Sequence, residues 1–332
     1  MEKTDNHSNG QNPLYDKLIL RRKNNETKKR KKHPACSPFA KKNSVNSKTC
    51  YTLGSLLEIR DKYNKIQPPN LRIKTSNPKK LWKTLKTRFS KKQQCKEKGE
   101  NCWLKIISDP NLSKKIDQEI FAPKTPPEWT QNPKEWLSNW DISNVLRQYE
   151  KIYPEFIYFE PSPIDFDERP SDIGGGKCVS QELCEFSLEK IISQGKNKVG
   201  FVFNLDKHTS NGSHWVSMFL DLKDKFIFYF DSVGEKIPDE IATLKDRIIE
   251  QARQKNINIE FISNNGSLHQ YGNSECGMYS LFFIVTMLTT PTRKNNKNIR
   301  KSDKILLFNG NRRIPDKIMQ EYRNIYFTPY DE

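Results

Sequence analysis

The chain has 332 residues and a formal net charge of +17, with 34% hydrophobic and 11% aromatic residues. This length and apolar content exclude a chain that is disordered throughout and predict one large domain plus an appendage. No stretch of about 18 apolar residues occurs and the N-terminus lacks an apolar signal segment, so we expect a soluble intracellular protein with no membrane span.

The net excess of positive charge is confined to the N-terminal part of the chain. Residues 1–100 hold 27 Lys and Arg against 8 Asp and Glu, whereas residues 101–332 hold 30 against 32. A field of this sign attracts polyanions such as nucleic acid or an anionic membrane surface. For RRKNNETKKRKKH (Arg21–His33), both a solvated disordered segment and a role in nucleic-acid contact or nuclear import are open.

Two basic regions precede the packed domain. Residues 1–48 are polar and rich in Lys and Asn, which predicts a disordered tail. Residues 49–125 predict a basic helical accessory region, with a first helix after Thr52 as N-cap. A second helix in PKKLWKTLKTRF (78–89) has apolar residues on one side and lysines on the other. Such a surface suits either solvent or nucleic acid.

Residues 126–332 predict a packed domain. Helices are expected in PKEWLSNWDISNVLRQYEKIYP, SQELCEFSLEKIISQG, DEIATLKDRIIEQARQ, CGMYSLFFIVTML and PDKIMQEYRNIYF. Strands are expected in EFIYF, KVGFVFNLD, SHWVSMFLDL, KFIFYFDSV and INIEFIS. Helices flanking a central mixed sheet give an α+β or α/β fold. DIGGGK (Asp172–Lys177) is typical of a flexible turn.

The seven cysteines show no CxxC pair and no regular framework, and they stand at positions 36, 50, 95, 102, 178, 184 and 276. Their odd number without a signal segment favours a reducing compartment. The five histidines do not alternate with cysteines at finger spacing, so no metal site is expected. Cys95 and Cys102 are interpreted as structural.

Cys276 is the strongest candidate for a reactive group. It opens the predicted helix CGMYSLFFIVTML, whose unpaired N–H groups lower the pKa of a thiol, and Gly277 leaves the sulfur uncrowded. A thiol nucleophile also needs a proton acceptor. His214 stands at the start of one strand, and Asp231 stands 17 residues later at the end of the next. Antiparallel pairing through the turn LKDK would bring the two together.

Gln270 completes the set. It lies six residues before Cys276, in the loop that leads to it. Acyl transfer places negative charge on the substrate carbonyl oxygen, and the Gln270 amide with the backbone N–H of Cys276 could stabilise that charge. Taken singly, each residue has an ordinary alternative: a strand-edge histidine, an Asp-Ser turn, a loop glutamine and a core thiol.

These motifs resemble those of the SUMO-protease-like cysteine peptidases, which include the Ulp enzymes, adenovirus endopeptidase and proteases of large DNA viruses. The similarity rests on HW at 214–215, Asp231, and Q-x5-CG at 270–277, and it extends over about residues 112–327. Within this group the asfarviral members show a clear resemblance, although they carry Asn at the position of Asp231. The combined motif is specific because the residues for four catalytic roles stand at the spacings found in the family.

The resemblance implies a papain-like core and a role for each residue. Cys276 would be the nucleophile, His214 the general base and then acid, Asp231 the imidazole orienter and Gln270 the oxyanion donor. Trp215 would wall a slot that admits only glycine. Trp140, or less favourably Trp136, would form the other wall, although a place in the core is the preferred interpretation of both.

A viral member of this family would cleave structural polyproteins at Gly-Gly-X sites during virion maturation. Residues 174–176 (GGG) are open as an autoprocessing site, with a turn the simpler interpretation. No cofactor is expected, apart from a DNA or peptide activator, and the basic residues 1–100 would bind nucleic acid. The expected location is the virion and host cytoplasm, or the nucleus if the tail directs import.

Two other functions are open at this point. One is a SUMO or ubiquitin-like deconjugating isopeptidase with the same site. The other is a non-enzymatic nucleic-acid-binding scaffold built on an inactive protease fold. The intact Cys276, His214, Asp231 and Gln270 argue against the scaffold.

Overall fold

The computed structural model describes residues 12–20, 35–92, 95, 99–107, 109–171, 174–290 and 301–329. They form two compact units. Unit 1 holds the described residues within Met1–Lys28, Trp136–Ile142 and Pro154–Gln320, and unit 2 holds those within Lys29–Glu135, Ser143–Tyr153 and Glu321–Glu332. Within the described ranges, no helix is both long and apolar enough to cross a bilayer.

Unit 1 is built on a mixed sheet with the strand order β1-β3-β4-β5-β6. The strands are β1 (Phe156–Tyr158), β2 (Ser162–Pro163), β3 (Lys198–Asn204), β4 (Trp215–Asp221), β5 (Phe226–Phe230) and β6 (Glu260–Ser263). β3, β4 and β5 pair antiparallel, whereas β1 and β2 run parallel to β3, and β6 runs parallel to β5. This confirms the expected class of a central mixed sheet flanked by helices.

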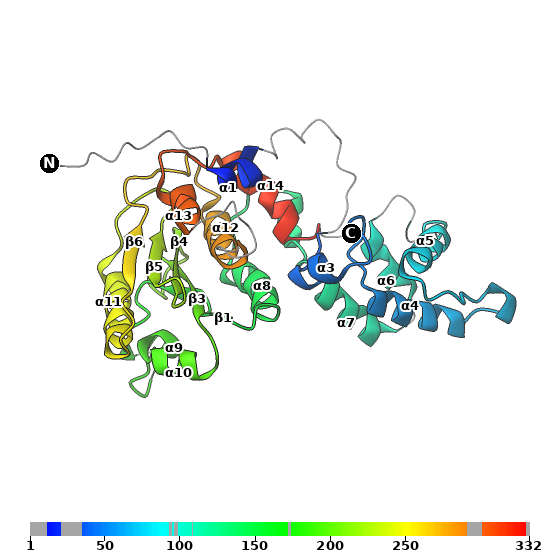
Figure 1. Ribbon diagram of the computed structural model, residues 1–332, viewed down its shortest axis with the longest axis horizontal. Coiled ribbons are helices and arrows are strands. Elements are labelled where there is room, and N and C mark those ends of the chain that lie inside the picture. The colour runs from blue at the N-terminus through cyan, green and yellow to red at the C-terminus, as the bar shows by residue number, and fades with distance from the viewer. Residues whose placement is uncertain are drawn as a thin grey trace. The chain divides into compact units, whose positions relative to one another are not determined.

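Helices cover both faces of this sheet (Figure 1). They are α1 (Pro13–Tyr15), α9 (Gln181–Cys184), α10 (Leu188–Ser193), α11 (Asp239–Gln254), α12 (Cys276–Thr289), α13 (Lys301–Asn309) and the first turns of α14 (Asp316–Tyr326). Along β5, Ile227 and Tyr229 pack in the cluster that includes α10 and α11, whereas Phe228 and Phe230 contact Phe283 of α12. Successive strand residues point to opposite faces, so a strand covered on both sides is apolar throughout.

Unit 2 is helical. Its elements are α3 (Pro38–Asn43), α4 (Leu53–Lys65), α5 (Pro78–Phe89), α6 (Trp103–Ile106), α7 (Pro110–Ile120) and most of α8 (Asn139–Glu150), with short 3-10 turns at Pro69–Leu71, Glu100–Cys102 and Pro127–Thr130. Thr52 caps α4 as predicted, through a reciprocal capping box with Ser55. The apolar side of α5 is fully buried at Leu81, Leu85 and Phe89.

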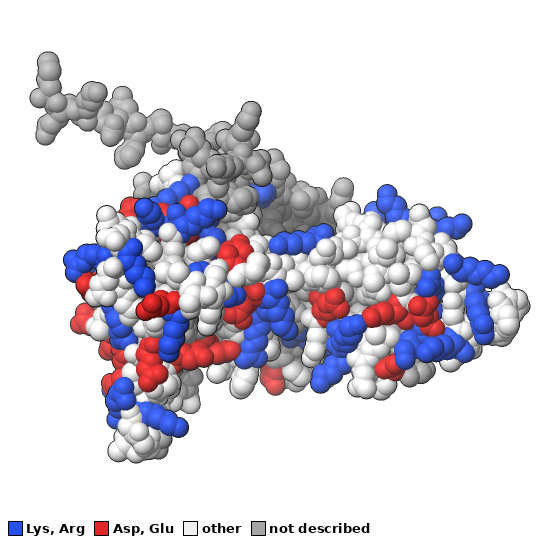
Figure 2. All heavy atoms as spheres, turned by 60° about the horizontal axis from the view of Figure 1, so that its bottom comes forward, with Lys and Arg blue, Asp and Glu red and all other residues white. Residues whose placement is uncertain are grey.

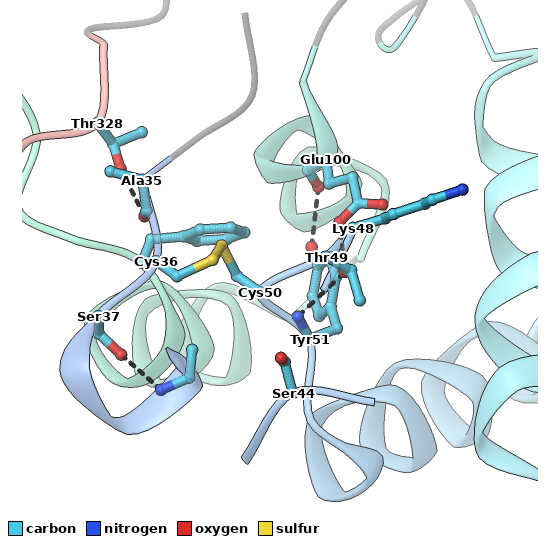
Figure 3. The surroundings of a disulfide bond; sticks show 12 residues. Ala35, Cys36, Ser37, Ser44, Lys48, Thr49, Cys50, Tyr51, Glu100 and Thr328 are labelled. Atoms are coloured by element: carbon cyan, nitrogen blue, oxygen red, sulfur yellow. Dashed lines mark hydrogen bonds between the residues drawn. A yellow bond between two sulfur atoms is a disulfide. The ribbon is translucent and has the colours of Figure 1, made fainter. Parts of the chain in front are cut away.

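Six of the seven cysteines pair, although the sequence shows no regular framework. The disulfides are Cys36–Cys50, Cys95–Cys102 and Cys178–Cys184. Figure 3 shows the first beside Tyr51, whose hydroxyl donates to the backbone oxygen of Glu100 at 2.9 Å. Pairing was missed because the local folding that brings each pair within bonding distance leaves no spacing rule in the sequence.

The boundaries of the predicted basic tail differ from the structure. Arg21–His33 lies outside the described residues. Asn12–Leu20 is not a polar tail: Leu14 and Ile19 are buried, and Tyr15 donates to the Arg313 carbonyl at 2.7 Å in unit 1. Residues 35–48 contribute Ala40 to the core of unit 2. The composition average over residues 1–48 hid the short apolar runs PLY and LIL.

Two further expectations need correction. SQELCEFSLEKIISQG is not one helix but two, α9 and α10, because Ser187 caps a new helix by accepting from Lys190 N–H. The helix around α8 begins only at Asn139. In the GGG turn, Gly174, Gly175 and Gly176 all have φ between 63° and 71°, which favours glycine, while Asp172 and Ile173 lie outside the described residues.

Candidate active site

Cys276 is the first residue of α12 and is almost fully buried. All seven cysteines lie in the described part of the chain, and Cys276 alone is outside a disulfide. Its position places the sulfur beside the partial positive charge of the helix N-terminus.

The antiparallel pairing of β4 and β5 brings His214 to Asp231. Ser217 lies opposite Phe230 in the register, so the residue before β4 and the residue after β5 meet at the same end of the pair. His214 Nε2 lies 2.6 Å from Asp231 Oδ1. The Cys276 side chain lies close enough to His214 to contribute to the raised pKa of the imidazole. With Nε2 taken by the carboxylate, Nδ1 is the ring nitrogen available to the sulfur.

The pKa of His214 is raised to about 9 from its ordinary value of 6.5. Burial alone would lower this pKa, but hydrogen bonds and charge attraction from Asp231 and Cys276 outweigh burial. The imidazole is therefore charged at neutral pH. A charged imidazole beside a helix-terminal sulfur is the arrangement that sustains a thiolate nucleophile.

Asp231 is held by backbone donors and by a side chain that the sequence analysis missed. The Asp231 carboxylate accepts from the N–H groups of Val233 at 3.0 Å and Glu235 at 3.3 Å. Asn264 accepts from the Asp231 N–H at 2.9 Å and donates to the Asp231 carbonyl at 2.6 Å. Asn264 is fully buried directly after β6, and a polar residue at a strand end was the available signal.

Gln270 is docked on the turn that follows Asp231. Its Oε1 accepts from the Ser232 hydroxyl at 2.8 Å, and its backbone N–H donates to the Ser232 carbonyl at 2.8 Å. One Nε2 hydrogen goes to the Gly272 carbonyl at 2.7 Å. Because a primary amide has two hydrogens, a second one is left for a developing oxyanion.

The loop from His269 to Gly272 is fixed from the other side by α14 and the segment before it. The Asp316 carboxylate accepts from the N–H groups of Tyr271 at 3.1 Å and Gly272 at 3.2 Å. Arg313 Nε donates to the His269 carbonyl at 2.5 Å. None of these contacts was predicted, because they join segments about 45 residues apart.

Trp215 and Leu137 pack around Gly277. Trp215 Nε1 donates to the Leu137 carbonyl at 2.9 Å. A Cβ on Gly277 would lie 2.9 Å from Leu137 side-chain atoms and 3.2 Å from Trp215 Cδ1. Glycine at 277 therefore permits this close packing, a stronger requirement than leaving the sulfur uncrowded.

The two other tryptophans considered for the slot are not core residues. Trp140 is 65% exposed and Trp136 is 38% exposed, so the interpretation as core tryptophans is wrong for both. Trp136 stands one residue before Leu137, and Trp140 stands three residues after it. Leu137 is the residue that contacts Gly277. Trp215, by contrast, is only 7% exposed.

The structure thus links His214 to Asp231 and Cys276, and links Gln270 to the Asp231 turn through Ser232. This set can supply a thiol nucleophile, a group that transfers protons and an amide N–H for an oxyanion. Within the described ranges, no group of three or more His, Cys, Asp or Glu side chains is arranged to hold a metal ion.

Comparisons with known proteins agree with this chemistry. Residues 199–332 match the Ulp1 protease family, C-terminal catalytic domain. A protein of Acanthamoeba polyphaga mimivirus named as a thiol protease is 29% identical over 257 residues, which cover 73% of this chain and 80% of that protein. A SUMO-1 cysteine protease of African swine fever virus is 26% identical over 222 residues, which cover 62% and 78%.

The fold is also shared with a solved structure. The crystal structure of the African swine fever virus protease superimposes with a TM-score of 0.58 at 20% identity, covering 89% of this chain and 96% of that one. Fold and site together define a cysteine protease. Residues 199–332 match the C-terminal catalytic domain of the Ulp1 protease family, and the similarity in sequence to a viral thiol protease extends over 73% of the chain. The predicted family and enzyme class are thereby confirmed.

Proposed function

We propose that this cysteine protease is a viral endopeptidase that cleaves structural core or capsid polyproteins at Gly-Gly-X sites during virion maturation. The observation that carries the proposal is the His214 contact with both Asp231 and Cys276, in a chain whose relatives include viral proteases. The proposed setting is the virion and the host cytoplasm.

Each residue has one task in this reaction. The Cys276 thiolate attacks the carbonyl carbon of the scissile bond, and Gln270 with the backbone N–H of Cys276 stabilises the oxyanion. His214 gives its proton to the departing amine, which leaves an acyl-enzyme. The same imidazole then takes a proton from water, which hydrolyses the thioester. Asp231 orients the ring throughout. No metal or organic cofactor is needed for these steps.

Glycine preference is proposed from the surroundings of the nucleophile. Trp215 and Leu137 already contact Gly277, the residue after Cys276, so little space is left beside the sulfur. A substrate residue without a Cβ would fit there most easily. Exposed Trp140 would supply the second wall of the slot.

Fluorogenic peptides test the proposal directly. We expect cleavage of Gly-Gly-X but not of Ala-Ala-X, and a loss of about 10⁴-fold or more in Cys276→Ala. The matched control is Cys184→Ala together with Cys178→Ala, which removes two cysteines and leaves the nucleophile. Turnover of a SUMO or ubiquitin-like fusion without cleavage of Gly-Gly-X peptides would replace the polyprotein proposal with the deconjugating isopeptidase, which the family match also favours.

A further inference from the structure

Residues 69–92 of unit 2 hold nine Lys and Arg and no Asp or Glu. Half of this segment is α5, a helix of 12 residues that begins at Pro78 after the cap Asn77. Figure 2 shows Lys and Arg side chains at the end of unit 2 where Figure 1 places α4 and α5.

The lysines of this helix point to solvent because its apolar side is already used. Leu81, Leu85 and Phe89 are fully buried in the core of unit 2. The exposed lysines are Lys79, Lys80, Lys83 and Lys86 on the helix, and Lys91 and Lys92 just after its end. Residues three and four apart lie on the same side of a helix, so Lys79, Lys83 and Lys86 form one row.

These six lysines, here called the α5 basic face, make no ion pair with any described residue. Other cations of unit 2 do: Lys115 bonds to Glu58 at 2.7 Å, and Lys124 lies 3.4 Å from Asp117. Unpaired like charges on one surface repel each other and raise the local positive potential. Because no carboxylate of the described residues neutralises these lysines, the face attracts an external anion.

We propose that the α5 basic face binds the phosphate backbone of duplex nucleic acid. The helix is about 18 Å long at 1.5 Å per residue, and a duplex of that length presents roughly ten phosphates, one for each ~1.7 Å of axis. The arrangement supplies charge without base-reading groups, so the contact is independent of sequence.

An anionic membrane is the less suitable partner. A helix that lies in a membrane surface buries its apolar side among the lipids. The apolar side of α5 packs inside the protein, and Trp82, the remaining aromatic residue, donates its Nε1–H to Glu100 at 2.8 Å.

The test measures the anisotropy of a labelled 20-base-pair duplex against salt concentration, with the full chain. Lys79→Ala/Lys83→Ala/Lys86→Ala should lower the slope of log K against log salt by about 2.7, since each phosphate contact contributes about 0.9. The matched control removes three exposed lysines of unit 1, Lys190, Lys223 and Lys236, and should keep the wild-type slope.

Two outcomes would overturn the proposal. Equal slopes for the α5 variant and the wild type would show that the face makes no phosphate contacts. Loss of binding to phosphatidylserine vesicles, with duplex binding unchanged, would assign the face to a membrane surface. Cleavage of the Gly-Gly-X peptide is expected to be the same in both triple variants, so this test is independent of the proposed protease substrate.

Discussion

The Asp316 carboxylate accepts a hydrogen bond from the backbone N–H of Gly272 at 3.2 Å. Gly272 in turn accepts from Gln270 Nε2 at 2.7 Å. A carboxylate at the start of α14 is thus two hydrogen bonds away from the proposed oxyanion donor. Asp316 is a positioning residue in this arrangement, since it acts on the reaction through the loop.

Asp316→Asn should therefore lower kcat by about 10-fold. This is less than the ~10²–10³-fold fall in kcat that follows complete loss of one oxyanion donor, because Gln270 is displaced and not removed. The rate of Cys276 alkylation by iodoacetamide should stay near the wild-type value, because alkylation needs the thiolate and not the oxyanion site. Asp239→Asn, on the exposed first turn of α11, is the control. A parallel fall in alkylation and turnover would indicate general loss of structure and contradict the positioning role.

Gln270→Ala should remove the oxyanion donor itself and reduce kcat by about 10²–10³-fold with little change in KM. Steady-state kinetics on the Gly-Gly-X peptide measure this, with the exposed Gln254→Ala as control. An unchanged kcat would assign Gln270 to holding the Ser232 turn only.

Asp231→Asn should shift the alkaline limit of activity. The pKa of His214 is raised to about 9, so the active imidazolium is lost as the pH rises through about 9. Without the carboxylate charge this pKa falls toward 6.5, and the alkaline limb of kcat/KM should move to lower pH. The pKa of His214 is higher in the folded chain than the ordinary value of 6.5 expected in the unfolded chain. The stability that the charged imidazole contributes is therefore complete below pH 6.5 and is lost as the pH rises through about 9.

Asp165→Asn is the matched control for this pH profile. Asp165 pairs with His208 at 2.7 Å, in a second aspartate–histidine contact outside the site. Its removal should leave the alkaline limb in place. A limb that stays near pH 9 in Asp231→Asn would show that another group sets it.

Gly277→Ala should destabilise the fold by about 1–3 kcal/mol, as overpacking does, because the new Cβ meets Leu137 at 2.9 Å. Leu137→Ala in the same chain should recover part of this loss by making room. Gly54→Ala in α4, where the new Cβ would lie 3.9 Å from Thr52 Oγ1, should be neutral or stabilising by up to about 1 kcal/mol. Thermal unfolding compares the variants, and equal effects at both glycines would refute the packing argument.

Local patterns predicted the elements whose stability is local or whose burial is complete. α11 occupies the predicted stretch from Asp239 to Gln254 because its apolar residues repeat with the helical period. β3, β4 and β5 were recognisable as apolar runs of strand length. The helix α13 was not predicted, since its pattern has little contrast between its faces.

The residues of the site likewise divide into those that a local pattern predicts and those that it does not. His214 and Asp231 could be paired from strand register alone, and Cys276 from its place at a helix start. Asn264 and Asp316 could not, because their contacts depend on how distant loops meet. Trp140 was placed near the site by resemblance, yet its 65% exposure is a property of tertiary packing that no sequence period encodes.

The disulfides leave Cys276 as the one cysteine that a thiol reagent can modify. Since the other six cysteines are paired, the oxidised chain has a single thiol to react. One molar equivalent of a thiol reagent, consumed without a reductant present, would then count competent enzyme molecules in a preparation. Specific activity could be expressed per active centre instead of per milligram of protein.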